Sequence, residues 1–198
     1  LLIMLKTVWR EKDAQLALQL ADSLLKKFYD EDTGGFFFTA HQQETLFTRP
    51  KPTMDHELPS GNGVASSALL SIGNLMGDHR FIEAAEGTLK WARAALERLP
   101  TEHSALVESL QQFNYPSQLI ILRGPDEEIA NWKKSLSDQY APWRQIYCIP
   151  YSVKNAIPPY LPGLISAEKQ QTPLAYVCQD MSCSLPISSL KELKSIVT

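Results

Sequence analysis

Hydrophobic positions recur at helical spacing through most of the front half of the chain. Apolar residues three and four apart predict one helix from about Asp13 to Tyr29 and another from His79 to Leu99. The apolar start, residues 1–9, is interpreted as the tail of an earlier helix, and a further helix is predicted from Glu102 to Phe113. The front of the chain is therefore expected to be helical.

The stretch Leu58–Gly77 differs from its neighbours because it contains no charged residue. Serine and asparagine interrupt it and argue against a membrane span, so its small and apolar residues predict a helix buried on most sides. The helix that follows is amphipathic, and Gly77-Asp78 is so short a joint that the two must run antiparallel. A buried inner helix followed by a solvent-exposed, amphipathic outer helix is typical of an (α/α) toroid of helical hairpins.

The hydrophobic pattern changes from Pro116 onward. The run Gln118–Arg123 is typical of a buried strand, and Gly124-Pro125 followed by three acids predicts the start of a helix. A second strand at Gln145–Ile149 then completes a strand-helix-strand unit, which is most simply parallel. A third strand is predicted at Leu174–Cys178.

A last helix is predicted after Ser189, because Ser189 and Glu192 form a capping-box pattern. The expected fold is therefore mainly α. A partial (α/α) toroid of helical hairpins over residues 1–115 would be followed by a small α/β annex over residues 116–198.

Composition narrows the class of protein. The chain has 198 residues, of which 44% are hydrophobic and 21% charged, as in ordinary globular proteins. The net charge of -3 provides no basic surface for nucleic acid or for an anionic membrane. The chain shows no signal-peptide pattern, lacks an initiator Met and has three cysteines, so we expect part of a longer, cytoplasmic protein.

The connector Gly34–Asn62 is the most informative segment, because helices in compact domains are usually joined by far shorter loops. Its phenylalanines are predicted to pack in the core, with Phe36 and Phe38 on one face of a small hairpin formed by residues 36–39 and 45–49. It also gathers charged side chains where a cleft would use them: His41, Glu44, Arg49, Lys51, Asp55, His56 and Glu57.

Four strings, GGFFFT, RPKPTMD, LPSGNGVA and AYVCQDMSC, give the chain a family resemblance. It resembles the carboxy-terminal part of the thioredoxin-domain proteins related to spermatogenesis-associated protein 20 and the bacterial YyaL proteins. In that family a thioredoxin-like domain precedes an (α/α)6 toroid of the six-hairpin glycosidase type. The resemblance implies a carbohydrate ligand in an epimerase- or glycosidase-like cleft, with the thioredoxin-like domain as a partner.

The chain also departs from the family pattern at two places. It has His41, Gln42, Gln43 and Glu44 where relatives show an acidic, histidine-rich DDHE, and His56 where they show a second acid or a glycine. The residues that match the pattern are Arg49, Pro50, Lys51, Asp55, Pro59, Ser60, Gly61 and Asn62.

Sugar chemistry needs two carboxylates or an acid-base pair such as His with Glu. The candidate catalytic residues are Asp55, His56 and Glu44. The candidate substrate-binding residues are Arg49, Lys51, Ser60 and Asn62.

Plainer roles remain open for the same residues. Arg49 and Asp55 are expected to form an ion pair that pins the connector, and Ser60 to cap the uncharged helix. In the alternative interpretation of the whole chain, it is a non-catalytic scaffold or protein-interaction module.

The cysteines do not match a redox or zinc motif. Cys178 and Cys183 are spaced C-x4-C rather than C-x-x-C, and no histidine follows Cys148 to complete a zinc site. Reduced structural thiols are expected, with a disulfide or a partial metal site as the alternatives. No glycine-rich phosphate loop is present, so neither a metal nor a cofactor is expected.

Overall fold

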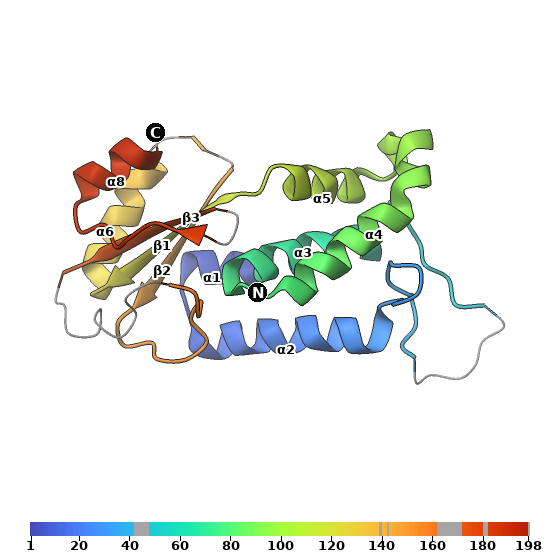
Figure 1. Cartoon of the computed structure of the whole chain (residues 1–198), viewed down its shortest axis with the longest axis horizontal. Coiled ribbons are helices and arrows are strands. Elements are labelled where there is room, and N and C mark those ends of the chain that lie inside the picture. The colour runs from blue at the N-terminus through green and yellow to red at the C-terminus, as the bar shows by residue number, and fades with distance from the viewer. Residues whose placement is uncertain (42–47, 139, 142, 162–171, 180–181, 198) are drawn as a thin grey trace. The chain divides into compact units, whose positions relative to one another are not determined.

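The computed structural model describes residues 1–41, 48–138, 140–141, 143–161, 172–179 and 182–197. It is a helix-rich chain with one small mixed sheet (Figure 1). The chain forms two compact units. The helical unit comprises Ala17–Asn74 and Asp78–Tyr115, and the α/β unit comprises Leu1–Leu16, Leu75–Gly77 and Pro116–Thr198.

Each helix predicted in the front half of the chain is present, with ends shifted by a few residues. They are α1 (Leu2–Thr7), α2 (Glu11–Phe28), α3 (Gly61–Met76), α4 (His79–Arg98), the 3-10 helix η1 (Pro100–Glu102) and α5 (Ser104–Asn114). The uncharged helix α3 is buried over most of its surface, as predicted, although Val64 is 54% exposed. Its small residues let other helices approach closely, so burial here comes from backbone proximity.

The turn between α3 and α4 follows from two residues. Gly77 adopts a positive φ of 71°, which glycine reaches without strain, and the side chain of Asp78 caps α4 by accepting a hydrogen bond from the Arg80 N–H at 3.0 Å. Gly73 of α3 lies against Phe81 and Ile82 of α4, so the second helix folds back on the first. The predicted antiparallel hairpin is confirmed.

The sheet of the α/β unit has the strand order β2-β1-β3-β4. Its elements are β1 (Gln118–Gly124), α6 (Asp126–Ser137), β2 (Arg144–Pro150), β3 (Leu174–Gln179), β4 (Ser182–Cys183) and α8 (Leu190–Val197). The predicted parallel pairing of β1 with β2 is confirmed, and β3 adds to the other side of β1 in the antiparallel sense. Strand β4 was not predicted, since two residues leave no periodic pattern.

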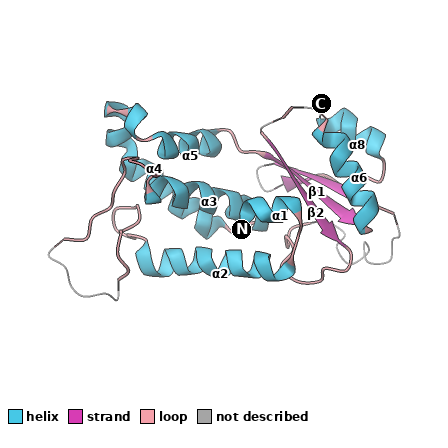
Figure 2. Cartoon of the chain, turned by 180° about the vertical axis from the view of Figure 1, so that it is seen from behind, coloured by secondary structure: helices cyan, strands magenta, loops and turns pink. Residues whose placement is uncertain are grey.

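The core of the α/β unit consists of apolar side chains between the sheet and two helices. Helices α6 and α8 cover one face of the sheet (Figure 2), where Ile120 and Leu122 of β1 are fully buried together with Ile129 and Leu193. On the opposite face the Trp9 ring meets the Tyr147 ring edge-on, with 5.9 Å between centroids.

The predictions of a buried Phe38 and of a strand at residues 36–39 are wrong. Phe36 is buried at 4% exposure, but Phe38 is 74% exposed, because residues 36–39 do not form a strand and alternation does not apply. Phe36 instead forms an isolated antiparallel β-bridge with Tyr29. Residues 45–47 of the predicted hairpin lie outside the described residues.

Cys178 and Cys183 form a disulfide rather than reduced thiols. The register of β3 and β4 places the two residues directly opposite each other. The missed strand β4 is therefore the reason that the thiol prediction failed. The thiol of Cys148 on β2 is free.

Candidate functional site

Asp55 fastens the connector to the starts of two helices. Its Oδ1 accepts a hydrogen bond from the Ser60 N–H at 2.8 Å, just before α3, and its Oδ2 accepts one from the Ala105 N–H at 2.9 Å, in the first turn of α5. The first N–H groups of a helix have no partner within the helix, so a carboxylate placed there satisfies them. Asp55 thereby holds the two N-termini at the same end of the helical unit.

This arrangement sets the ionisation of Asp55. Burial acts to raise its pKa, but hydrogen bonds from Ser60 and Ala105 outweigh that effect, and the pKa lies below its ordinary value. A carboxylate kept ionised, with both oxygens engaged, is poorly suited to donate a proton. The geometry supports a positioning role for Asp55.

Ser60 and Asn62 continue the same pattern at the start of α3. The Ser60 hydroxyl accepts a hydrogen bond from the Gly63 N–H at 3.1 Å, so the predicted cap is confirmed. Asn62 is 1% exposed; its Oδ1 accepts from the Phe36 N–H at 2.6 Å, and its Nδ2 donates to the carbonyls of Phe36 (3.0 Å) and Pro52 (2.9 Å). Its side chain therefore crosslinks two parts of the connector.

Lys51 anchors the turn at the end of α2. Its ammonium donates to Asp30 Oδ2 at 2.7 Å, to the Thr33 hydroxyl at 2.6 Å and to the Gly34 carbonyl at 2.8 Å, and it lies 4.7 Å from the centroid of the Trp91 ring. The hydrogen bond from Lys51 lowers the pKa of Asp30 to about 2, in spite of partial burial. Lys51 is committed to this internal network.

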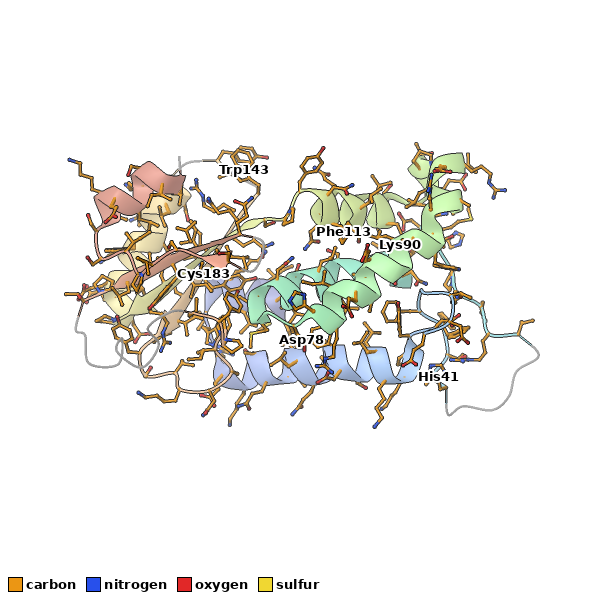
Figure 3. The ribbon with its side chains drawn as sticks, in the orientation of Figure 1. His41, Asp78, Lys90, Phe113, Trp143 and Cys183 are labelled. Atoms are coloured by element: carbon orange, nitrogen blue, oxygen red, sulfur yellow. A yellow bond between two sulfur atoms is a disulfide. The ribbon has the colours of Figure 1, made fainter. Side chains whose placement is uncertain are left out.

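Arg49 lies beside His41, which Figure 3 labels, and shares the Phe37 ring with Lys51, whose ammonium is 5.2 Å from the ring centroid. Its guanidinium stacks 3.9 Å from the Phe37 centroid and donates to the Thr39 carbonyl at 2.7 Å and to His41 Nδ1 at 3.1 Å. Because a guanidinium only donates, Nδ1 accepts and the His41 Nε2–H donates to the Tyr29 carbonyl at 3.0 Å.

The expected ion pair between Arg49 and Asp55 is wrong. Arg49 turns back to residues 37–41, whereas Asp55 is used by the backbone of the helix starts. An acid beside two unpaired helix termini satisfies backbone donors, and those donors were not visible in the charge pattern.

The remaining candidates divide by exposure. His56 and Glu57 are exposed beside the start of α3, and the His56 N–H donates to the Leu58 carbonyl at 3.1 Å. Glu44 lies outside the described residues. The structure thus brings Asp55, Ser60 and Asn62 together at one helix end and leaves His56 facing solvent. Lys51 and Arg49 lie over the same Phe37 ring but donate to different partners.

Sequence reasoning missed two polar residues of this region. His103 is buried at 4% exposure; its Nδ1–H donates to the Leu99 carbonyl at 2.8 Å, and its Nε2 accepts from the Thr53 hydroxyl at 3.1 Å. Nothing in the sequence links Thr53 to His103. Asp30 could have been found, since an acid at a helix end that is followed within four residues by paired glycines is a common turn signal.

Among the described residues, no group of three or more His, Cys, Asp or Glu side chains is placed to hold a metal ion. Within the same residues, no helix combines the length and apolar character needed to cross a membrane.

The chain is similar in sequence to a human protein. No family model matches the chain. The human protein Spermatogenesis-associated protein 20 is 27% identical over 188 residues, which are 91% of this chain and 24% of that protein. The chain therefore spans about a quarter of the length of this relative. The similarity covers most of the chain and supports a relation to the family of the human protein.

Proposed function

We propose that this chain is a helical-hairpin region of an (α/α) toroid in a larger thioredoxin-domain protein, and that it lines an epimerase- or glycosidase-like carbohydrate cleft. The carbohydrate ligand would enter beside the N-termini of α3 and α5. The thioredoxin-like domain of the larger protein would be its intramolecular partner.

One observation carries the proposal. Asp55 binds the N–H groups of Ser60 and Ala105 at once, so α3 and α5 begin side by side. Further along, Ser109 is hydrogen-bonded to Gly63 and Ser67 to Gln112, so the two helices run in the same direction. The charged helix α4 returns between them in the sequence. A ring of hairpins requires parallel inner helices joined by outer helices of opposite direction, and α3, α4 and α5 supply one such step.

The packing of α3 against α5 supports the same arrangement. Gly63 lies so close to Ala105 that an added Cβ would be 2.5 Å from the Ala105 Cβ, and the Ser109 hydroxyl donates to the Gly63 carbonyl at 2.8 Å. Close parallel helices bring their N-termini to one side of the unit. Asp55 and Ser60 occupy the N–H groups of Ser60, Ala105 and Gly63 there, so a hydroxyl-rich ligand would meet the exposed side chains beside them.

The residues divide into two roles under this proposal. Asp55, Ser60, Asn62, Arg49 and Lys51 shape the mouth through the contacts described above. His56 is the exposed titratable group that would meet a sugar, with Glu57 next to it. An imidazole and a carboxylate are groups that sugar epimerisation or hydrolysis uses.

The test is calorimetric titration of the protein with a panel of mono- and disaccharides. His56→Ala should weaken binding of any sugar that binds by about tenfold, the worth of one hydrogen bond to a charged or polar partner, and should leave the melting temperature unchanged. His79→Ala is the matched control, because His79 is also exposed but lies at the start of α4. Absence of binding across the panel, or equal binding by both variants, would contradict the proposal.

A further inference from the structure

We propose that the Cys178–Cys183 disulfide is a reversible redox site, reduced by dithiols while the α/β unit stays folded. Its opening would release the edge of the sheet formed by residues 182–185, called the strap below, while Ile187 stays in the core of the unit. This inference does not depend on the proposed carbohydrate function.

The two sulfurs differ in their access to solvent. Cys178 is buried in β3 at 1% exposure, whereas Cys183 is partly exposed in the two-residue edge strand β4 (Figure 3). An attacking thiolate must approach one sulfur along the line of the S–S bond, so reduction can begin at Cys183 and not at Cys178. The first nucleophilic attack therefore takes place at Cys183 Sγ.

The disulfide holds the strap at a position that backbone hydrogen bonds do not secure. Val177 exchanges hydrogen bonds with Ser184, and Ala175 exchanges both backbone bonds with Ile187 at 2.9 Å. Antiparallel partners alternate between hydrogen-bonded and non-hydrogen-bonded pairs, so the backbone groups of Cys178 point to β1 instead. The S–S bond is therefore the link between strap and sheet at this register.

The ring that the disulfide closes is short. The two cysteines are only five residues apart, and the chain-entropy contribution of a disulfide grows with the length of the closed loop. The core around Ile120, Leu122 and Leu193 is built without either sulfur. Reduction should thus loosen the strap without unfolding the unit.

The exchange balances as follows. The thiolate of an external dithiol attacks Cys183 Sγ, the S–S bond breaks, and Cys178 leaves as a thiolate that takes up a proton. The second thiol of the reductant then attacks the mixed disulfide and releases Cys183 as a thiol. The products are two protein thiols and one oxidised dithiol.

The test uses the purified protein in glutathione buffers and in dithiothreitol, without denaturant. Trapping of thiols with an alkylating reagent, followed by mass spectrometry, should show full conversion between disulfide and dithiol in both directions. On reduction, amide hydrogen exchange at Ser184 and Val177 should accelerate at least tenfold, while exchange at Ile120 and Leu122 stays unchanged.

Two variants make the result specific. Cys183→Ser should show the fast exchange of the strap without any reductant, and Cys148→Ser should behave as the wild type, which excludes exchange through the third cysteine. The proposal is overturned by a disulfide that resists dithiothreitol in the folded protein, by a bond that never forms in oxidised glutathione, by reduction that leaves the strap unchanged, or by reduction that unfolds the α/β unit.

Discussion

The helical unit and the α/β unit satisfy their backbones by different means. In the α/β unit, strand pairing uses most backbone groups of β1, and apolar side chains such as Ile120 and Leu122 fill the core. In the helical unit, the long connector has few strand partners, and side chains such as Asn62 bind its backbone directly.

The difference explains why a long connector contains many polar residues that have no catalytic role. Buried backbone N–H and C=O groups nearly always need partners, so a loop that runs beside helix starts recruits Asp, Asn, Ser and Lys to supply them. Those residues resemble an active site in the sequence. The better functional candidates are the polar side chains that the backbone does not use, here His56 and Glu57.

The largest expected effect comes from removing the Asn62 side chain. Asn62→Ala leaves the Phe36 N–H and the carbonyls of Phe36 and Pro52 without these partners, at a cost of about 3 to 4 kcal/mol. The melting temperature of the helical unit should fall by about 15 to 25 °C. Leu122→Ala truncates a side chain in the apolar core of the other unit. It should lower the free energy of unfolding by a similar amount, about 3 kcal/mol.

Asn114→Ala is the matched control for Asn62, because Asn114 is exposed at the end of α5 and should change stability by less than about 0.5 kcal/mol. Urea denaturation measures all three variants. If Asn62→Ala lowers the free energy of unfolding by less than about 1 kcal/mol, the Asn62 hydrogen bonds are not what holds the connector in place.

The two units are expected to lose stability at opposite ends of the pH range. The pKa of Asp30 is lowered to about 2 by Lys51, so its contribution of about 2 kcal/mol is present above the unfolded pKa of about 4 and is lost as pH falls toward 2. Burial raises the pKa of Tyr160 to about 12, so its contribution is complete below about pH 10 and is lost as pH rises toward 12. Acid should weaken the helical unit, and alkali the α/β unit.

Melting temperatures of the wild type, Asp30→Asn and Tyr160→Phe between pH 2 and pH 12 check this. Asp30→Asn should be less stable than the wild type near pH 7 and close to it near pH 2, where about half of the wild-type carboxyl is protonated and most of its contribution is lost. Tyr160→Phe should reduce only the alkaline loss. A stability difference for Asp30→Asn that is the same at every pH would contradict the assignment.

The smallest expected effect concerns close helix packing. A Cβ at Gly63 would lie 2.5 Å from the Ala105 Cβ and 2.8 Å from its backbone carbon, so Gly63→Ala should cost about 2 kcal/mol by forcing α3 and α5 apart. Gly61→Ala is the control in the same helix, since nothing lies within 4 Å of the added Cβ. Equal melting temperatures for the two variants would show that α3 and α5 do not approach closely.

The local elements followed from the sequence. The helical periodicity of α2 and α4, the apolar run of β1 and the Gly124-Pro125 helix start depend on neighbouring residues, and each was predicted within a few positions. The burial of α3 was also predictable, because a helix without charges has no face suited to water.

Contacts between distant residues did not follow from the sequence. The hydrogen bonds from the Ala105 N–H to Asp55 and from the Thr53 hydroxyl to His103 join residues 50 positions apart. The Cys178–Cys183 bond depends on the pairing of a two-residue strand. Periodicity reports which face of an element is buried, but it carries no information on which backbone donor lies opposite a given carboxylate. The sequence determined the elements and their buried faces, whereas the tertiary structure alone decided that the connector's polar residues bind backbone, because those partners exist only once the helices have packed.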